Sequence, residues 1–149
     1  MNALTAQEFY KLLINQCISP TLHDDGFKGS AGKYTLPHPR AFILIGFQKN
    51  KWNMKNEVSF TVNVSVIEKG KWEVALKEHP WMEQVPKPSV DYPVEMWTQR
   101  LAMIPEGASD KWWKINSESN IETIAQDILD RIRKDALPAI EKRINQTLE

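Results

Sequence analysis

The sequence predicts a single two-layer α+β domain over residues 1–149, with an antiparallel sheet of four or five strands covered on one face by helices. Residues 57–67 alternate without a break between polar and apolar side chains, the pattern of a half-buried strand. Helical spacing is confined to the two ends of the chain and strand patterns to its middle, which favours α+β over a parallel α/β fold. A chain of 149 residues is long enough to bury one core.

The first element expected is an N-terminal helix that covers the sheet. It begins at a capping box, in which Thr5 and Glu8 can each bond the backbone amide of the other. The apolar residues that follow at helical spacing are Phe9, Leu12, Leu13 and Cys17. Gly26 is expected to end the helical region. Because Cys17 is the only cysteine, no internal disulfide can form, and we interpret it as a small core residue.

Four segments besides 57–67 are expected to be strands, namely 34–36, 41–48, 96–104 and 112–115. Segment 41–48 is apolar on both faces, which places it inside the sheet. Residues 28–33 are glycine-rich and are expected to form a turn, since they lack the spacing of a phosphate-binding loop. Residues 70–93 contain four prolines and are expected to form a long connection that packs on the sheet through Trp72, Trp81 and Tyr92.

The last element expected is a long C-terminal helix that covers the same face of the sheet as the first. A second capping-box pattern spans Ser119 to Glu122. One apolar stripe follows, made of Ile121, Ile124, Ala125, Ile128, Leu129 and Ile132. Pro138 lacks a backbone donor, so it is expected to kink or split this helix.

Several short motifs carry a resemblance to a known family. They are Gly26-Phe27-Lys28, Gln48, Phe60-Thr61-Val62-Asn63, Arg100-Leu101, Asp110-Lys111-Trp112-Trp113 and Ala136-Leu137-Pro138. In this order, over nearly the whole chain, the sequence resembles the bacterial family known as domain of unknown function 4304. The resemblance implies an α+β fold and brings no activity with it.

No catalytic, metal-binding or cofactor-binding residue is expected from the sequence. His23, Asp24 and Asp25 are adjacent and rarely converge on one ion in that arrangement, so we interpret them as a polar helix end. No apolar run approaches the roughly 20 residues of a membrane span, and no secretory signal opens the chain. We therefore expect a cytoplasmic protein with no membrane partner.

A local excess of positive charge gives one candidate surface, although the formal net charge is zero. Residues 26–56 contain no acidic residue. The basic rim predicted there consists of Lys28, Lys33, Arg40, Lys49, Lys51 and Lys55, together with Trp52. Such a rim can bind nucleic acid or another anionic partner. The alternative is that these lysines only solvate the edges of the sheet.

The polar face of segment 57–67 gives the second candidate surface. Its residues are Ser59, Thr61, Asn63 and Ser65, and Arg100 is added from the next strand. A sheet face of small polar residues can hold a ligand or a partner loop, or it can simply face water. The leading interpretation is a protein-binding module of the immunity or accessory type, without catalysis. The alternatives are nucleic-acid binding through the rim, and small-ligand binding or enzymatic activity on the polar face.

Overall fold

The computed structural model of the chain describes residues 4–51 and 55–147. The N-terminal helical segment consists of α1 (Ala6–Leu12), the π-helix η1 (Leu13–Ile18) and α2 (Ser19–Asp24). The middle of the chain forms β1 (Lys28–Ser30), β2 (Lys33–Leu36), β3 (Ala41–Lys49), β4 (Val58–Glu68), α3 (Lys69–Glu78), β5 (Trp97–Arg100), the 3₁₀-helix η2 (Leu101–Met103) and β6 (Trp113–Ile115). The C-terminal segment consists of α4 (Ile121–Arg131), the π-helix η3 (Ile132–Ala136) and α5 (Leu137–Thr147).

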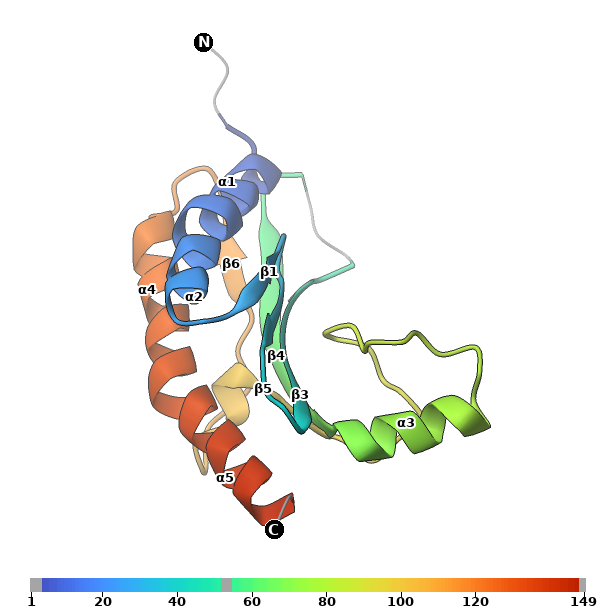
Figure 1. The fold of residues 1–149 in the computed structure, drawn as a ribbon. Coiled ribbons are helices and arrows are strands. Elements are labelled where there is room, and N and C mark those ends of the chain that lie inside the picture. Colours follow the sequence, from blue (N-terminus) through green and yellow to red (C-terminus); the bar gives the residue numbers. More distant parts are fainter. Residues whose placement is uncertain (1–3, 52–54, 148–149) are drawn as a thin grey trace.

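The sheet is antiparallel throughout and runs in the order β1-β2-β3-β4-β5, with β6 also paired to β4 (Figure 1). This confirms the predicted α+β class. Strands β5 and β6 follow one another along the same edge of β4, because β3 occupies the other edge. The sheet has six strands, since the residues expected to form only a turn begin with the short strand β1. Gly29 in β1 has a φ of 115°, and a Cβ there would meet the Lys33 carbonyl.

The N-terminal and C-terminal helices cover one face of the sheet, as predicted (Figure 1). The alternate apolar residues of β4 are all buried in this main core and are Val58, Phe60, Val62, Val64 and Val66. Phe60 lies at its centre, with its ring stacked at 6.0 Å from Trp113 and in edge contact at 5.1 Å with Tyr10. The strict alternation of the sequence therefore corresponds to a strand with one face in this core.

Both prolines within the helices follow a π-helical turn. Pro138 lies two residues after the end of η3, where the backbone N–H of Leu137 bonds to the carbonyl of Ile132, five residues earlier. The wider turn accommodates a residue that lacks a donor and whose ring crowds the preceding turn. The predicted interruption of the C-terminal helix is thus confirmed, in the form of a π-helical turn. Pro20 follows η1 in the same way.

The opposite face of the sheet is covered in part by α3 and by residues 79–96, which we call the strap (Figure 1). They share a second buried cluster with the sheet, made of Leu44, Ile67, Trp72, Ala75 and Met82. Trp72 and Tyr92 pack edge to face at 4.8 Å, and the Trp72 indole donates to the carbonyl of Gln84 at 3.0 Å. The predicted packing of this connection through Trp72 and Tyr92 is therefore confirmed.

Two predictions about the middle of the chain were wrong. Trp81 does not pin the strap, because 71% of its surface is exposed. The strand expected over 96–104 ends at Arg100, where η2 begins. The adjacent residues Leu101 and Ala102 are both buried, and a strand directs successive side chains to opposite faces. The turn of η2 lets both enter the main core.

Candidate functional site

The polar face of β4 lies beneath the strap and is not an ordinary wet face. Thr61 is fully buried, and Asn63 and Ser65 are only 8% and 3% exposed. Each of these side chains has a defined partner. The Thr61 hydroxyl donates to the Lys111 carbonyl at 3.0 Å, and the Ser65 and Thr98 hydroxyls lie 3.2 Å apart. Ser59, at the start of β4, is half-buried.

Two of these polar residues of β4, Asn63 and Ser65, line a pocket of about 220 Å³ between the sheet and the strap. The lining residues are Gln48 from β3, Asn63 and Ser65 from β4, Thr98 from β5, and Ser89, Val90 and Asp91 from the strap. The Asn63 amide donates to Gln48 Oε1 at 2.8 Å and to Ser89 Oγ at 3.1 Å. Asn63 thus connects the sheet to the strap at the edge of the pocket.

Gly46 and Ser89 fix how closely the strap approaches the sheet. Gly46 lies opposite Asn63 in the β3–β4 register, and a Cβ there would lie 2.2 Å from Ser89 Oγ and 2.7 Å from Pro88 Cβ. Ser89 itself has a φ of 64°, a conformation that residues other than glycine seldom adopt. Unfavourable backbone conformations of this kind persist only where the surrounding structure enforces them, and they cluster at functional sites.

Arg100 lies on the same side of the sheet but does not line this pocket. It is opposite Asn63 in the β4–β5 register. Its guanidinium pairs with Asp110 and lies 5.1 Å from the ring centroid of Trp112. Asp110 also accepts from the backbone amide of Lys111. The guanidinium of Arg100 is therefore already paired, next to the pocket.

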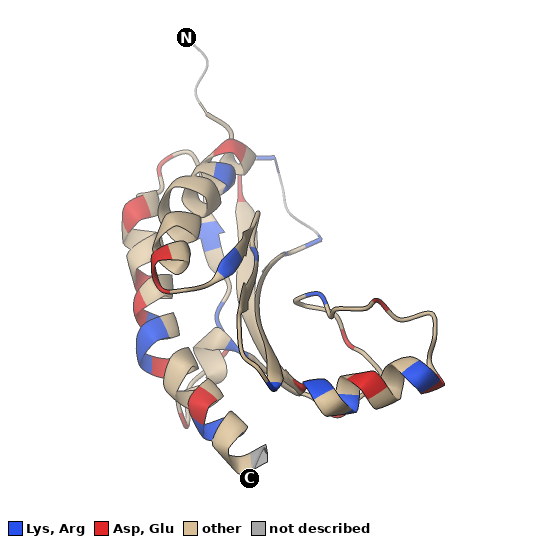
Figure 2. Ribbon diagram, in the orientation of Figure 1, with Lys and Arg blue, Asp and Glu red and all other residues tan. Residues whose placement is uncertain are grey.

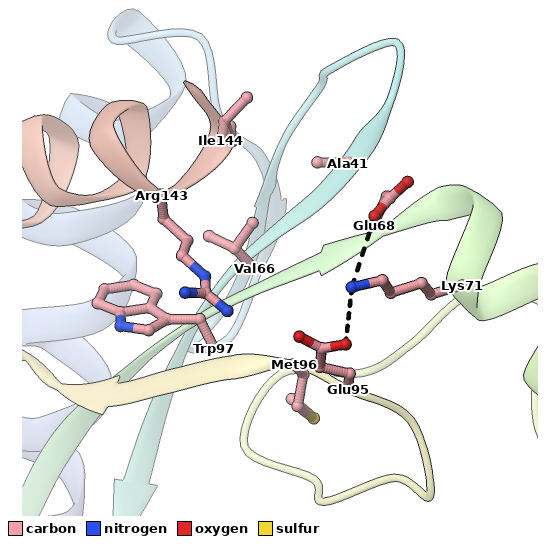
Figure 3. Close-up of a pocket in the computed structure, with 9 residues that line it drawn as sticks. All are labelled: Ala41, Val66, Glu68, Lys71, Glu95, Met96, Trp97, Arg143 and Ile144. Atoms are coloured by element: carbon pink, nitrogen blue, oxygen red, sulfur yellow. Dashed lines mark hydrogen bonds and ion pairs between the residues drawn. The ribbon is translucent and has the colours of Figure 1, made fainter. Parts of the chain in front are cut away.

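Ion pairs hold the strap where it joins α3 and β5. Lys71 lies 2.7 Å from Glu95 and 3.8 Å from Glu68, and this interaction lowers the pKa of the Glu95 carboxyl (Figure 3). The cavity beside them, which Trp97 and Arg143 also line, measures only about 10 Å³. That volume is about the minimum that holds one water molecule, roughly 10–15 Å³. We therefore interpret this cluster as a structural clamp.

The residues of the predicted basic rim do not gather on one surface. Lys28 and Lys33 fall on the strap side of β1 and β2 by register, whereas Lys49 lies on the helix side, 5.3 Å from the Tyr10 ring centroid. Arg40 precedes β3, while Lys51 and Lys55 follow it at the other end. Trp52 lies outside the described residues. Figure 2 shows basic and acidic residues interleaved on the helices.

Most of the large exposed apolar side chains belong to α3 and the strap. Within residues 4–51 and 55–147, six large hydrophobic residues are exposed, and four of them lie between positions 74 and 90. These four, which we call the arm surface, are Val74 (57% exposed), Trp81 (71%), Val85 (54%) and Val90 (41%). This group was not predicted, because Trp81 was expected to pack on the sheet and a tryptophan is more often a core residue than a contact residue.

The pocket also contains residues that the sequence reasoning did not assign. Gln48 and Thr98 reach it through strand register, and Ser89 and Asp91 through the path of the strap. Gly46 was the available signal, because a glycine inside a strand often marks the close approach of another segment. In the described part of the chain, no cluster of three His, Cys, Asp or Glu side chains is placed to hold a metal ion. No described helix has both the length and the apolar character of a membrane span.

Comparison with known proteins gives one match. The model of a family described as a domain of unknown function (DUF4304) matches residues 18–142. No match was found among curated proteins or among solved structures. The matched range contains the whole sheet, α3 and the strap, together with α2, α4 and η3.

Proposed function

The chain belongs to the DUF4304 family, and we propose that it is a protein-binding module that contacts its partner through the arm surface. The observation that carries this proposal is the exposure of Trp81, at 71%, among three exposed valines. Four of the six large exposed hydrophobic residues in the described part of the chain lie on this one segment. Tryptophan is also enriched among the few residues that dominate binding energy in protein interfaces.

The arm surface is presented by a segment that is already held in place. Trp72 and Met82 are buried beneath it, and Tyr92 accepts from the Lys87 amide at 2.9 Å and bonds Glu83 at 3.1 Å. The Trp81 ring has an edge contact with His79 at 5.9 Å. A surface ordered before binding loses less conformational entropy when the partner docks. The fixed strap therefore favours a specific partner.

Among the Asp, Glu, Lys and Arg side chains of the strap, Glu83, Lys87 and Glu95 are paired within the strap or with α3, and Asp91 has no ion pair with any residue that the structure describes. Lys87 lies 3.0 Å from Glu83, and this pair lowers the pKa of Glu83 and raises the pKa of Lys87. Lys71 pairs with Glu95. We therefore expect apolar contact to supply most of the affinity, so that binding survives high salt. A nucleic-acid complex would lose affinity steeply with salt through counterion release.

A pull-down from the source cells tests the proposal. The tagged chain, its Trp81→Ala variant and its Met103→Ala variant are compared at about 0.1 M and about 1 M salt, where charges are screened over ~10 Å and ~3 Å. Met103 is the matched control, because it is 40% exposed and lies outside the arm surface.

We expect one stoichiometric protein that the wild type and Met103→Ala retain at both salt concentrations. With that protein purified, Trp81→Ala should weaken binding by about 30-fold, which corresponds to the ~2 kcal/mol of a hot-spot residue. Equal binding by both variants contradicts the proposal. Nucleic acid that elutes only at low salt would support the alternative of a basic rim. We further propose that the module acts in the bacterial cytoplasm, in keeping with its single cysteine.

A further inference from the structure

The pocket between the strap and the sheet has the features of a ligand site, and Trp81, the exposed indole of the proposed partner surface, does not line it. Its floor is the central strand β4, where Asn63 and Ser65 are 8% and 3% exposed. Its wall is the strap, in which Ser89 has a φ of 64° and lies against Gly46. A rigid floor and an enforced backbone conformation in the wall are what preorganise a binding site.

The size of the pocket restricts the ligand. Its volume is about 220 Å³. This lies below the roughly 300–1,000 Å³ of pockets that hold drug-sized ligands. A small metabolite matches this volume better than a nucleotide or a peptide chain does.

The chemistry of the lining favours a positively charged ligand that donates hydrogen bonds. Six of the seven lining residues are polar, and the only charged one is Asp91. Among the described residues, no Lys, Arg or His nitrogen lies within ion-pair distance of the Asp91 carboxylate. Lys87 of the strap pairs with Glu83, and Arg100 of β5 pairs with Asp110. Hydroxyl and amide oxygens supply further acceptors.

From this arrangement we propose that the pocket binds a small primary amine, with its ammonium group on Asp91 and its remaining polar atoms on the hydroxyls of Ser65 and Thr98. The hydroxyls of Ser65 and Thr98 lie 3.2 Å apart on neighbouring strands, so one ligand atom can contact both. The carboxylate of Asp91 supplies a charge-assisted hydrogen bond, which is worth more than a neutral one. An anion would instead meet a carboxylate with no cation in the lining.

The test uses matched probes on the full chain. Binding of 1,4-diaminobutane, ethanolamine, the neutral analogue 1,4-butanediol and inorganic phosphate is followed by calorimetry and by the side-chain amide signals of Asn63 and Gln48 in ¹H–¹⁵N spectra. Those amides lie in the pocket lining, so their shifts report binding at this place. The variants are Asp91→Asn, Thr98→Val and Asp24→Asn. The first two change exposed side chains, and Asp24 is an exposed carboxylate on the helix side of the sheet.

We expect an amine to bind and to shift both amide signals. Asp91→Asn should weaken amine binding at least tenfold, in line with about 1.5–3 kcal/mol for a hydrogen bond to a charged group. Thr98→Val should weaken it about 2- to 10-fold, while Asp24→Asn and Trp81→Ala should leave it unchanged. The proposal is overturned if no amine binds at about 10 mM, if the diol or phosphate binds as tightly as the diamine, or if Asp91→Asn has no effect. Trp81→Ala should weaken partner binding and leave amine binding unchanged, so the failure of one proposal can be told from the failure of the other.

Discussion

Replacing Gly46 with alanine should destabilise the protein by pushing the strap off the sheet. The new Cβ would lie 2.2 Å from Ser89 Oγ, where ordinary contacts begin at 3.4 Å. Rotation of the serine side chain does not relieve the clash, because Pro88 Cβ at 2.7 Å and the Ser89 backbone nitrogen at 3.2 Å are also too close. Overpacking of this kind costs about 1–3 kcal/mol. Displacement also breaks the bond from Asn63 to Ser89, worth about 1 kcal/mol.

We therefore expect Gly46→Ala to lower the free energy of unfolding by about 2–4 kcal/mol, and Tm by about 4–16 °C for a chain of this length. Urea denaturation measures the first quantity. Hydrogen exchange of residues 82–94 reports whether the strap has moved, and their protection should fall. The double variant Gly46→Ala, Ser89→Gly should recover only part of the loss, because the contact with Pro88 remains.

Gly70→Ala is the matched control for this substitution. Gly70 lies in α3, and the nearest atom that a Cβ would meet is a carboxylate oxygen of Glu68 at 3.7 Å. Alanine there should leave the strap in place and raise stability by up to about 1 kcal/mol through helix propensity. If Gly46→Ala proves as stable as the wild type, with unchanged exchange in the strap, the packing of the strap on β3 is refuted.

Three further predictions concern other parts of the structure. In urea denaturation, Trp113→Ala should lower the free energy of unfolding by about 3–5 kcal/mol, because the indole is buried against Phe60. Trp112→Ala should lower it by about 1 kcal/mol or less. Similar losses at both positions would contradict this prediction. Ser89→Gly should be more stable than Ser89→Ala by about 1 kcal/mol, because both lose the hydroxyl and only alanine keeps a Cβ at a φ of 64°. Partial burial opposes ionisation of Asp127, but hydrogen bonds from Trp113 and Arg131 outweigh it and lower its pKa. The stabilisation that ionised Asp127 contributes is therefore fully present above the ordinary aspartate pKa of about 3.9, and it is lost as the pH falls through the lower pKa of the folded state. The difference in Tm between wild type and Asp127→Asn should narrow over that pH range.

The fold was largely predictable from local patterns. The alternation over 57–67 predicts β4 and its buried face, and the capping boxes and apolar stripes predict the helices at the two ends. The end of β5 was not predictable in this way. Leu101 and Ala102 fit a strand pattern, yet both are buried because the chain turns there into η2.

The candidate site was predictable only in part. Asn63 and Ser65 could be assigned because they follow from the alternation of a single strand. Ser89, which bonds Asn63 from 26 residues further along, and Asp91 lie in a proline-rich strap whose path no local period encodes. Trp81 was misassigned for the same reason. Trp81 lies between Pro80 and Pro86, and no periodic pattern there distinguishes a buried tryptophan from an exposed one.

Site-specific photo-crosslinking tests the proposed partner surface most directly. Benzoylphenylalanine is placed at Val85, which is 54% exposed within the arm surface, or at Met103, which is 40% exposed outside it. Illumination of the source cells should give one discrete protein adduct from Val85→benzoylphenylalanine and none from Met103→benzoylphenylalanine. Adding Trp81→Ala to the first variant should abolish the adduct. The same adduct from both positions, or an adduct from position 85 that persists without the indole, would contradict a module that binds its partner through Trp81.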